Sequence, residues 1–405
     1  MPGNPDLGPI WLQDITDLAF CGVNLFFVLS GFLLFLPYAR AILSGGVWPS
    51  VGQFYWRRVL RIVPGYLAAF AILLLFQDTF MLSRQHLGDV LLTALMLHDM
   101  NWHTFNTIAY QVNIAFWTLA VEWQFYLLLP WIAIIVAKVA GPRGRRLFAW
   151  RLGLSLCALV LVGLGERWTA SVLFYDWHQY YPIAAPHGVG LLMAVTYGMK
   201  GKFIEVFALG MAVSVVYVRY RERGRVPRWM RGFFCVFAVI GTPIGLGLCV
   251  QWAVHDHRIP NTVPYAWVFP PDGQLWSIFG EWVLGLCFAL LLCGVVLGPR
   301  WLGQIFAWAP ARFLGIISYS IYLWHLPIIH AFAPQALQHP ATAYVRLAIW
   351  TIVTVPVFCA AAYYLVERPF IRLRRAAHAL SEVAVSARLA EEYQEAPLPL
   401  IPMSR

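Results

Sequence analysis

Apolar residues along this chain gather into nine long runs, which are separated by short polar or basic segments. Each run approaches the ~17 to 25 residues that a helix needs to cross a bilayer. The runs are continuous, whereas the strands of a lipid-facing barrel alternate apolar and polar residues over about ten positions. The pattern therefore predicts helices near residues 17–37, 59–76, 114–137, 152–166, 203–218, 232–252, 277–297, 312–333 and 343–366. Two shorter apolar stretches, 89–98 and 189–199, are expected to lie at the interface or to re-enter.

The composition also indicates a membrane protein. Of the 405 residues, 60% are hydrophobic and 12% are charged, about half the ~25% of charged residues that is usual in soluble domains. We therefore predict an all-α, polytopic membrane helix bundle with about nine transmembrane helices. The seven cysteines show no C-x-x-C spacing and the histidines no H-x-x-x-H spacing, so neither a disulfide framework nor a metal site is expected.

Charge predicts the orientation. The net charge is +10, but the basic residues sit in short loops rather than in one patch, so topology explains them better than nucleic-acid binding. Most of the 29 Lys and Arg residues fall on one side of the predicted spans, and the positive-inside rule places that side in the cytoplasm. We predict a plasma-membrane protein with a short extracytoplasmic stub (1–16), a transmembrane domain (17–370) and a cytoplasmic tail (371–405) that is partly helical and then flexible.

Glu122 lies in an apolar run, where an ionised carboxylate costs at least ~2.5 kcal/mol without a partner. Thr118, Glu122 and Tyr126 follow at i, i+4 and i+8, so they share one helix face and a hydroxyl can bond to the carboxylate. A carboxylate so placed can orient a base, stabilise a cation or carry protons. The structural alternative is an ion pair between Glu122 and Arg61 or another arginine.

Three arginines, Arg57, Arg58 and Arg61, stand at the predicted cytoplasmic mouth of the second span, the last two on one helical face. Planar guanidinium groups there could bind phosphates in a bidentate manner. The alternative is topogenic charge that reaches lipid headgroups. Arg61 lies deeper than that alternative needs, and Pro64 frees backbone groups beside it.

A second polar stripe is formed by Ser318, Tyr322 and His325 at i, i+4 and i+7. His325 could serve as a base or bind an acceptor, although a single histidine on an apolar face is often only a satisfied core residue. We interpret Ser30 and Gly31 as small packing residues.

Two outer carboxylates, Glu205 and Glu281, lie near the outer ends of their spans. We interpret both as structural, with Lys202 or Arg258 as partners.

Five motifs, in order along the chain, resemble those of acyltransferase family three, the polytopic membrane acyltransferases that modify surface polysaccharides, lipids and antibiotics. They are Gly22-Val-Asn-Leu-Phe-Phe-Val-Leu-Ser-Gly-Phe32, Arg57-Arg-Val-Leu-Arg-Ile-Val-Pro-Gly-Tyr66, Trp117-Thr-Leu-Ala-Val-Glu-Trp-Gln-Phe-Tyr126, Ser318-Tyr-Ser-Ile-Tyr-Leu-Trp-His325 and Glu367-Arg-Pro-Phe370. The resemblance implies a ten-helix core that moves an acyl group, usually acetyl, from cytoplasmic acyl-CoA to a hydroxyl of a surface glycan, lipid or small molecule.

The resemblance also implies residue roles. Arg58 and Arg61, with Arg57 beside them, correspond to the positions near the CoA, and the catalytic candidates are Glu122, Tyr126, Tyr322 and His325. Membrane lipids, acyl-CoA and the hydroxyl acceptor are the expected partners, and no metal is expected.

Three departures from the family pattern matter. The chain starts after the position of the family's first helix, which carries a histidine thought to activate the acceptor. From this we expect impaired activity. The favoured explanation is that the start of the sequence is placed too far downstream, and the other explanation is a shortened homologue. Trp123 stands where another Glu is common, and Asn24 stands where the residue is often acidic.

The alternative functions are a proton-coupled transporter or lipid flippase, and a non-catalytic membrane partner.

Overall fold

The computed structural model describes residues 21–76, 86–100, 104, 108, 110–144, 146–173, 201–222, 224, 226–256, 275–337 and 342–373. The predictions for the N-terminal stub, for residues 189–199, for Arg258 and for nearly all of the tail fall outside these residues. Within them the chain forms helices and no strand, as the continuous apolar runs predicted.

The first half of the bundle runs from α2 to α8. Its helices are α2 (Gly22–Ser44), α3 (Val51–Leu75), α4 (Leu87–Ala94), η4 (His98–Met100), α6 (Tyr110–Asn113), α7 (Phe116–Ala140) and α8 (Phe148–Leu173). Helix α4 has eight residues and is too short to span, as expected for the 89–98 stretch.

The second half runs from α11 to the last π-helical turn. Its helices are α11 (Ile204–Val216), η6 (Tyr217–Glu222), α12 (Arg228–Val236), η7 (Phe237–Gly241), α13 (Thr242–Asp256), α14 (Leu275–Leu297), α15 (Arg300–Ala307), α16 (Ala309–Leu337), α17 (Ala343–Ala362) and η9 (Tyr363–Glu367).

Eight helices in the described part of the chain are long and apolar enough to cross a membrane. They match eight of the nine predicted runs. The remaining run corresponds to α11, which is helical but has only 13 residues before it continues into the basic η6. Eight of the residues of α11 are buried, so it packs inside the bundle rather than against its edge.

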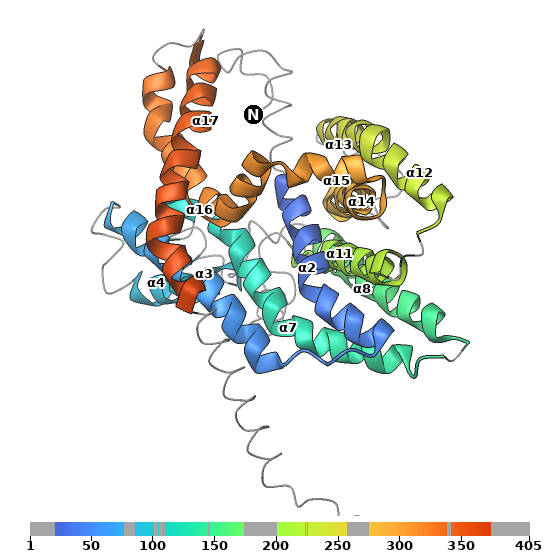
Figure 1. Cartoon of the computed structure of the whole chain (residues 1–405). Helices are drawn as coiled ribbons and strands as arrows, with labels where there is room; N and C mark the ends of the chain where they lie inside the picture. Colours follow the sequence, from blue (N-terminus) through green and yellow to red (C-terminus); the bar gives the residue numbers. More distant parts are fainter. Residues whose placement is uncertain are drawn as a thin grey trace, which may run out of the picture.

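The bundle has two groups of helices. Helices α16 and α17 lie side by side and α3 packs against α16 and η9, whereas α2, α7, α8, α11 and α14 form the larger group. Figure 1 shows α16 and α17 on one side, α12 to α14 on the other, and α2 and α7 between them. The candidate residues of α7 and α16 therefore meet where the two groups adjoin.

Two glycines allow α2 and α11 to cross backbone to backbone. A Cβ atom on Gly31 would lie 2.2 Å from the carbonyl oxygen of Phe207, and one on Gly210 would lie 2.1 Å from that of Val28. Only hydrogen fits at either position. Gly31 is therefore a packing residue, as we interpreted it from the sequence.

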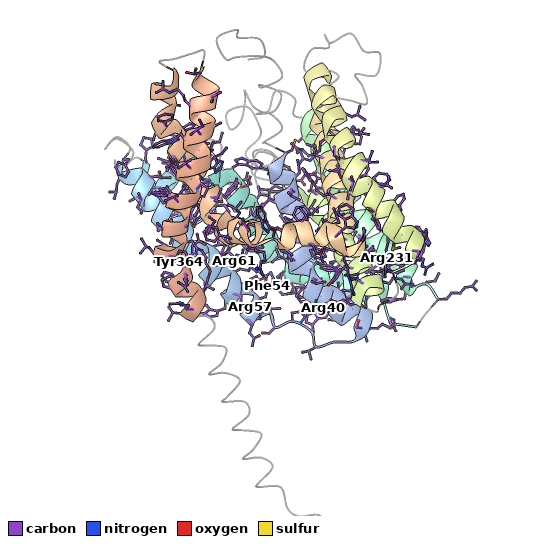
Figure 2. The ribbon with its side chains drawn as sticks, turned by 45° about the horizontal axis from the view of Figure 1, so that its top comes forward. Arg40, Phe54, Arg57, Arg61, Arg231 and Tyr364 are labelled. Atoms are coloured by element: carbon purple, nitrogen blue, oxygen red, sulfur yellow. The ribbon has the colours of Figure 1, made fainter. Side chains whose placement is uncertain are left out.

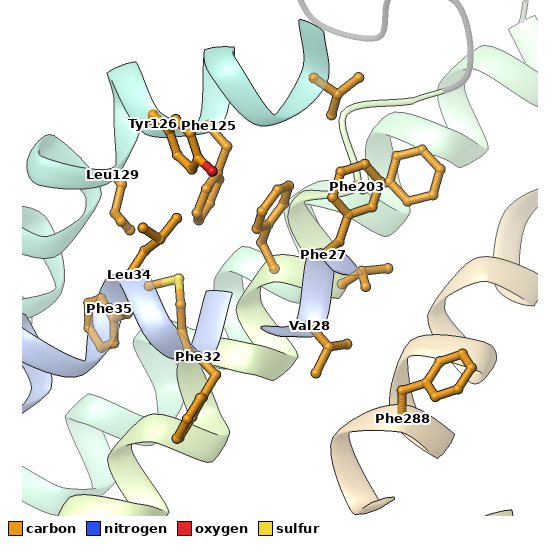
Figure 3. Packing of buried hydrophobic residues seen from close by; sticks show 14 of the residues in the cluster. Phe27, Val28, Phe32, Leu34, Phe35, Phe125, Tyr126, Leu129, Phe203 and Phe288 are labelled. Atoms are coloured by element: carbon orange, nitrogen blue, oxygen red, sulfur yellow. The ribbon is translucent and has the colours of Figure 1, made fainter. Parts of the chain in front are cut away.

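Aromatic side chains fill the space beside this crossing. Phe27 on α2 contacts Phe203 and Phe207 at ring-centroid distances of 4.7 and 4.9 Å, and Phe125 on α7 stacks on Phe207 at 3.6 Å. Figure 3 shows Tyr126 beside Phe125, directed from α7 toward α2. The aromatic core thus places the Tyr126 hydroxyl inside the bundle, where it can meet polar groups of α2.

Candidate active site

Glu122 is the centre of the most buried polar cluster on α7. Glu122 is only 4% exposed. The carboxylate oxygen Oε1 accepts a hydrogen bond from the Ser30 hydroxyl of α2 at 2.7 Å and another from the Tyr126 hydroxyl, one turn along α7. The i, i+4 relation that the sequence predicted between Glu122 and Tyr126 is thus present in the structure.

Ser30 was interpreted from the sequence as a packing residue, and the structure corrects this. Its hydroxyl donates to Glu122 across the helix interface, because the Gly31 crossing fixes this face of α2 inside the bundle. A buried carboxylate retains its charge at lower cost when hydroxyls donate to it. Ser30 therefore belongs to the polar site as well as to the packing.

Two arginines of α3 flank the carboxylate without pairing with it directly. The Arg58 guanidinium lies 5.7 Å from the ring centroids of both Phe54 and Tyr126, and its Nε is buried without a hydrogen-bond partner among the described residues. Arg58 and Arg61 both interact electrostatically with Glu122. In the described residues, however, the hydrogen bonds to Glu122 come from hydroxyls, and no ion pair joins it to an arginine.

Arg61 is more accessible than its two neighbours. Arg57 and Arg58 are half-buried, whereas Arg61 is exposed on the surface of the protein. Figure 2 shows both at the same end of the molecule as Arg40 and Arg231, which come from α2 and α12. One end of the bundle is thus strongly basic, with Arg58 connecting that end to the buried Glu122 cluster.

A second buried carboxylate also lies near Arg61. Glu367, in the π-helical turn η9, is buried and accepts a hydrogen bond from the Ser320 hydroxyl of α16. Arg61 interacts electrostatically with it. One turn beyond Arg61, Gly65 has no side chain, and this allows Tyr319 and Glu367 to approach α3 closely.

Tyr322 connects α16 to the start of α7. Its hydroxyl donates to the Ala115 carbonyl oxygen at 2.7 Å and also bonds to the Thr118 hydroxyl. Thr118 is one turn from Glu122 on α7, so Tyr322 lies next to the carboxylate cluster rather than within it. Its ring also stacks on Phe26 of α2, with a centroid distance of 6.0 Å.

His325 is half-buried and lies one turn further along α16. Its Nδ1 lies 3.0 Å from the Ile321 carbonyl oxygen and 2.9 Å from that of Tyr322. Carbonyl oxygens only accept, so Nδ1 carries a hydrogen, and the neutral ring then has an unprotonated Nε2. No bond joins His325 to Glu122 among the described residues; Tyr322 and Thr118 lie between them.

The predicted stripe on α16 is only partly correct. Tyr322 and His325 face the interior, but Ser318 is exposed and donates to the Gly315 carbonyl oxygen of its own helix. Its neighbours Tyr319 and Ser320 face the site instead. The three positions share one helical face, so Ser318 differs from Tyr322 and His325 in its place along the axis, where its face of α16 is left uncovered.

A second buried ionic cluster lies between η4, α8 and α11. Arg167 Nε binds Glu205 Oε1 at 2.6 Å, and Lys202 Nζ binds Asp99 Oδ2 at 2.6 Å. The interpretation of Glu205 as structural agrees with its ion pair, but its partner is Arg167 and not Lys202. Gln124 on α7 also bonds to Asp99, at 3.4 Å, which links this cluster to the helix that carries Glu122.

Glu281 also has a different partner from those considered. Its Oε2 accepts a hydrogen bond from Asn24 Nδ2 at 2.6 Å. Asn24 is the position at which the family is often acidic. With an amide there, the neighbouring carboxylate of α14 gains a neutral donor instead of a second negative charge.

Comparison with known families decides the assignment. The family described as "Acyltransferase domain" matches residues 1–366. The chain belongs to this family. The five motifs predicted that result, and each of them contributes a side chain to the clusters around Glu122 and Glu367.

Curated relatives of the chain include named acetyltransferases of this family. It is 26% identical over 362 residues to the putative peptidoglycan O-acetyltransferase YrhL of Bacillus subtilis (strain 168), an alignment that covers 86% of this chain and 50% of the relative. It is 24% identical over 332 residues to the peptidoglycan O-acetyltransferase OatA of Listeria monocytogenes, covering 78% and 46%. The chain spans about half the length of these relatives. No solved structure matches it significantly.

Several site residues of this acyltransferase domain were not found by sequence reasoning. Ser320 and Glu367 lie in quoted motifs, but their mutual hydrogen bond joins positions 47 residues apart. The sequence did contain one indication of this site: Glu367 is a carboxylate at the end of an apolar run, much as Glu122 is a carboxylate within one. Asn113, which is buried and bonds to α16, lies outside every motif.

Proposed function

We propose that this domain is a membrane O-acyltransferase that moves an acetyl group from acetyl-CoA to a hydroxyl of a surface glycan. The observation that carries this proposal is the buried Glu122 carboxylate, which receives two hydroxyl donors and has two arginines beside it. Family membership gives the reaction class. The names of the relatives, which are peptidoglycan O-acetyltransferases, favour a glycan acceptor.

The basic end of the bundle is the proposed donor side. Arg57 and the exposed Arg61 can meet the phosphates of CoA in solution, and the half-buried Arg58, which lies over the Tyr126 ring, continues the positive potential toward Glu122. A guanidinium binds a phosphate through two parallel hydrogen bonds, which fixes its orientation. This end is cytoplasmic in the proposed orientation, which places the C-terminus inside, as the basic loops predict.

Tyr126 and Glu122 form the proposed middle of the transfer path. The Tyr126 hydroxyl donates to Glu122, so its oxygen is polarised and carries added negative charge. It can therefore stabilise a cationic group nearby or pass a proton to the carboxylate. Arg58 lies over the same tyrosine ring and keeps the local charge balanced.

His325 is the proposed base on the acceptor side. Its Nδ1 is occupied by backbone carbonyls, so Nε2 is the nitrogen that can take the acceptor's proton. The acceptor oxygen then attacks the thioester carbon, an ester C–O bond forms, and the C–S bond breaks. The proton lost by the hydroxyl is balanced by the one that the CoA thiolate gains. A positioned base contributes about 10²- to 10⁴-fold to such a step.

The test is acetyl transfer from radiolabelled acetyl-CoA to peptidoglycan fragments by the full chain in nanodiscs. Glu122→Gln and His325→Gln should each lower the rate at least about 100-fold. Glu222→Gln is the matched control, because Glu222 pairs with Arg40 at the exposed surface and should change the rate little. Unchanged transfer in Glu122→Gln would reject the site.

Donor binding is tested separately with immobilised CoA. Arg58→Ala and Arg61→Ala should each weaken binding by about ten- to 100-fold, as expected for the loss of a charged phosphate contact. Arg40→Ala is the control, since Arg40 is also at the basic end but pairs with Glu222. Equal losses in all three variants would indicate a general effect of charge and no specific CoA site.

The same preparation distinguishes the rival functions. A proton-coupled transporter or flippase would give flux across the membrane without acetyl-CoA, and a non-catalytic partner would give neither flux nor transfer.

A further inference from the structure

Pro327 interrupts the hydrogen bonds of α16 two residues beyond His325. A proline has no backbone N–H, so in a helix the carbonyl oxygen four residues earlier loses its usual donor. Here that oxygen belongs to Leu323, which lies between Tyr322 and His325. In an apolar interior such a carbonyl costs free energy unless another donor reaches it.

Asn113 supplies that donor from a different helix. Its Nδ2 donates to the Leu323 carbonyl oxygen at 2.8 Å, and its Oδ1 accepts from the backbone N–H of Ala115 at 3.1 Å. Asn113 is 4% exposed, so water does not compete for these bonds. One amide thus connects the interrupted turn of α16 with the turn that starts α7.

Ala115 is held from both directions. Its N–H is bound by Asn113 and its carbonyl oxygen accepts from the Tyr322 hydroxyl at 2.7 Å. The bonds made by Asn113 and Tyr322 thus tie residues 322 and 323 of α16 to Ala115 at the start of α7. His325 is two residues further along α16, and its Nδ1 is bonded to the carbonyls of residues 321 and 322.

We infer that Asn113 is a positioning residue for His325: it replaces the hydrogen bond that Pro327 removes and so fixes the turn that orients the imidazole. This inference rests on the proposed function for its effect on rate, but the hydrogen bond itself can be tested without it. Without the amide, the turn between Leu323 and Pro327 loses its one cross-helix donor among the described residues and His325 changes its direction.

The first experiment is a double-mutant cycle between Asn113 and Pro327 in the full chain. Asn113→Ala should lower kcat for acetyl transfer about ten- to 100-fold, because misplacing a catalytic group by about 1 Å can cost ~100-fold. Pro327→Ala restores an N–H to the helix, so the same Asn113→Ala change should cost at least tenfold less in that background. Equal losses in both backgrounds would overturn the inference.

The second experiment separates positioning from general stability. In a His325→Gln background, Asn113→Ala should cause no further loss of rate but should still lower the unfolding midpoint in detergent. The control is Trp350→Phe, which removes the 3.2 Å bond from Trp350 Nε1 to the Ile328 carbonyl oxygen on the same helix. It should lower the midpoint with little effect on kcat. A further rate loss in the His325→Gln background would overturn the positioning role.

Failure of the proposed function would give a different result. If the wild-type chain transfers no acetyl group, the unfolding midpoints of the four Asn113 and Pro327 proteins still report whether the two changes are coupled. If the changes in midpoint caused by the two substitutions simply add in the double variant, Asn113 does not compensate for the proline. A single cooperative unfolding transition in each variant shows that it is folded.

Discussion

Replacing Gly31 with alanine should disturb both the packing of the bundle and the Glu122 cluster. The new Cβ would lie 2.2 Å from the Phe207 carbonyl oxygen, 3.0 Å from its carbonyl carbon and 3.2 Å from its Cα, all backbone atoms. Non-bonded heavy atoms need about 3.5 Å, so α2 and α11 must move apart by about 1 Å. No side-chain rotation can relieve the overlap, because the position of an alanine Cβ is fixed by the backbone and the Phe207 atoms it meets are backbone atoms.

The expected cost follows from that displacement. Overpacking a well-packed interior costs about 1–3 kcal/mol, and a rigid backbone neighbour favours the upper half of this range. Ser30 is adjacent to Gly31, so the same movement lengthens the 2.7 Å bond from Ser30 to Glu122 toward a distance at which it no longer counts as a hydrogen bond. We therefore expect Gly31→Ala to lose stability together with acetyl-transfer rate.

The assay is thermal unfolding in detergent alongside acetyl transfer, with Gly22→Ala as the control. Gly22 is on the same helix, but a Cβ there meets no atom within 4 Å, so alanine should be neutral or stabilise the helix by about 0.5–1 kcal/mol. If Gly31→Ala unfolds at the same temperature as Gly22→Ala, the close crossing of α2 and α11 is wrong. If it is destabilised but fully active, the link from the crossing to Glu122 is wrong.

Two further predictions concern buried ionisable groups. Arg167→Met should destabilise the protein by about 3–5 kcal/mol, because it leaves the Glu205 carboxylate buried without its partner, whereas Arg40→Met, at the exposed pair with Glu222, should cost under about 1 kcal/mol. Unfolding in detergent measures both, and equal costs would contradict the burial of the first pair. Burial lowers the pKa of His98 from 6.5 to about 4. The unfolded chain therefore binds this proton first, and stability should fall by up to about 3 kcal/mol as the pH decreases from 6.5 to 4. A His98→Asn variant should lack this component of the pH dependence; an unchanged slope would show that other groups cause it.

Residues within one helix were related correctly by sequence reasoning. Helical geometry alone places Tyr126 one turn from Glu122, and the structure has the bond between them. The same reasoning failed for Ser318, because helical periodicity does not tell how far along α16 the neighbouring helices cover the shared face, and Ser318 is exposed. Periodicity relates positions on a helix to one another but does not relate them to a neighbouring helix.

Partners from distant segments could not be predicted in this way. Ser30 and Glu122 are 92 residues apart, and Asn113 and Leu323 are 210 apart. Lys202 and Arg258 were the predicted candidates for pairing with the outer carboxylates, but the structure pairs Glu205 with Arg167. Sequence proximity was misleading there, because Lys202 precedes α11 and reaches η4, while the end of α8 passes directly beside Glu205.

The amino-acid sequence by itself determined that this chain is a helical membrane protein of the acyltransferase domain family, because apolar run length and motif order need no knowledge of packing. The tertiary structure alone decided which polar groups share a site. In a bilayer, buried donors and acceptors must be satisfied within the protein. Which donor reaches which acceptor depends on how closely helices approach, and here this is set by positions such as Gly31, Gly65 and Gly210.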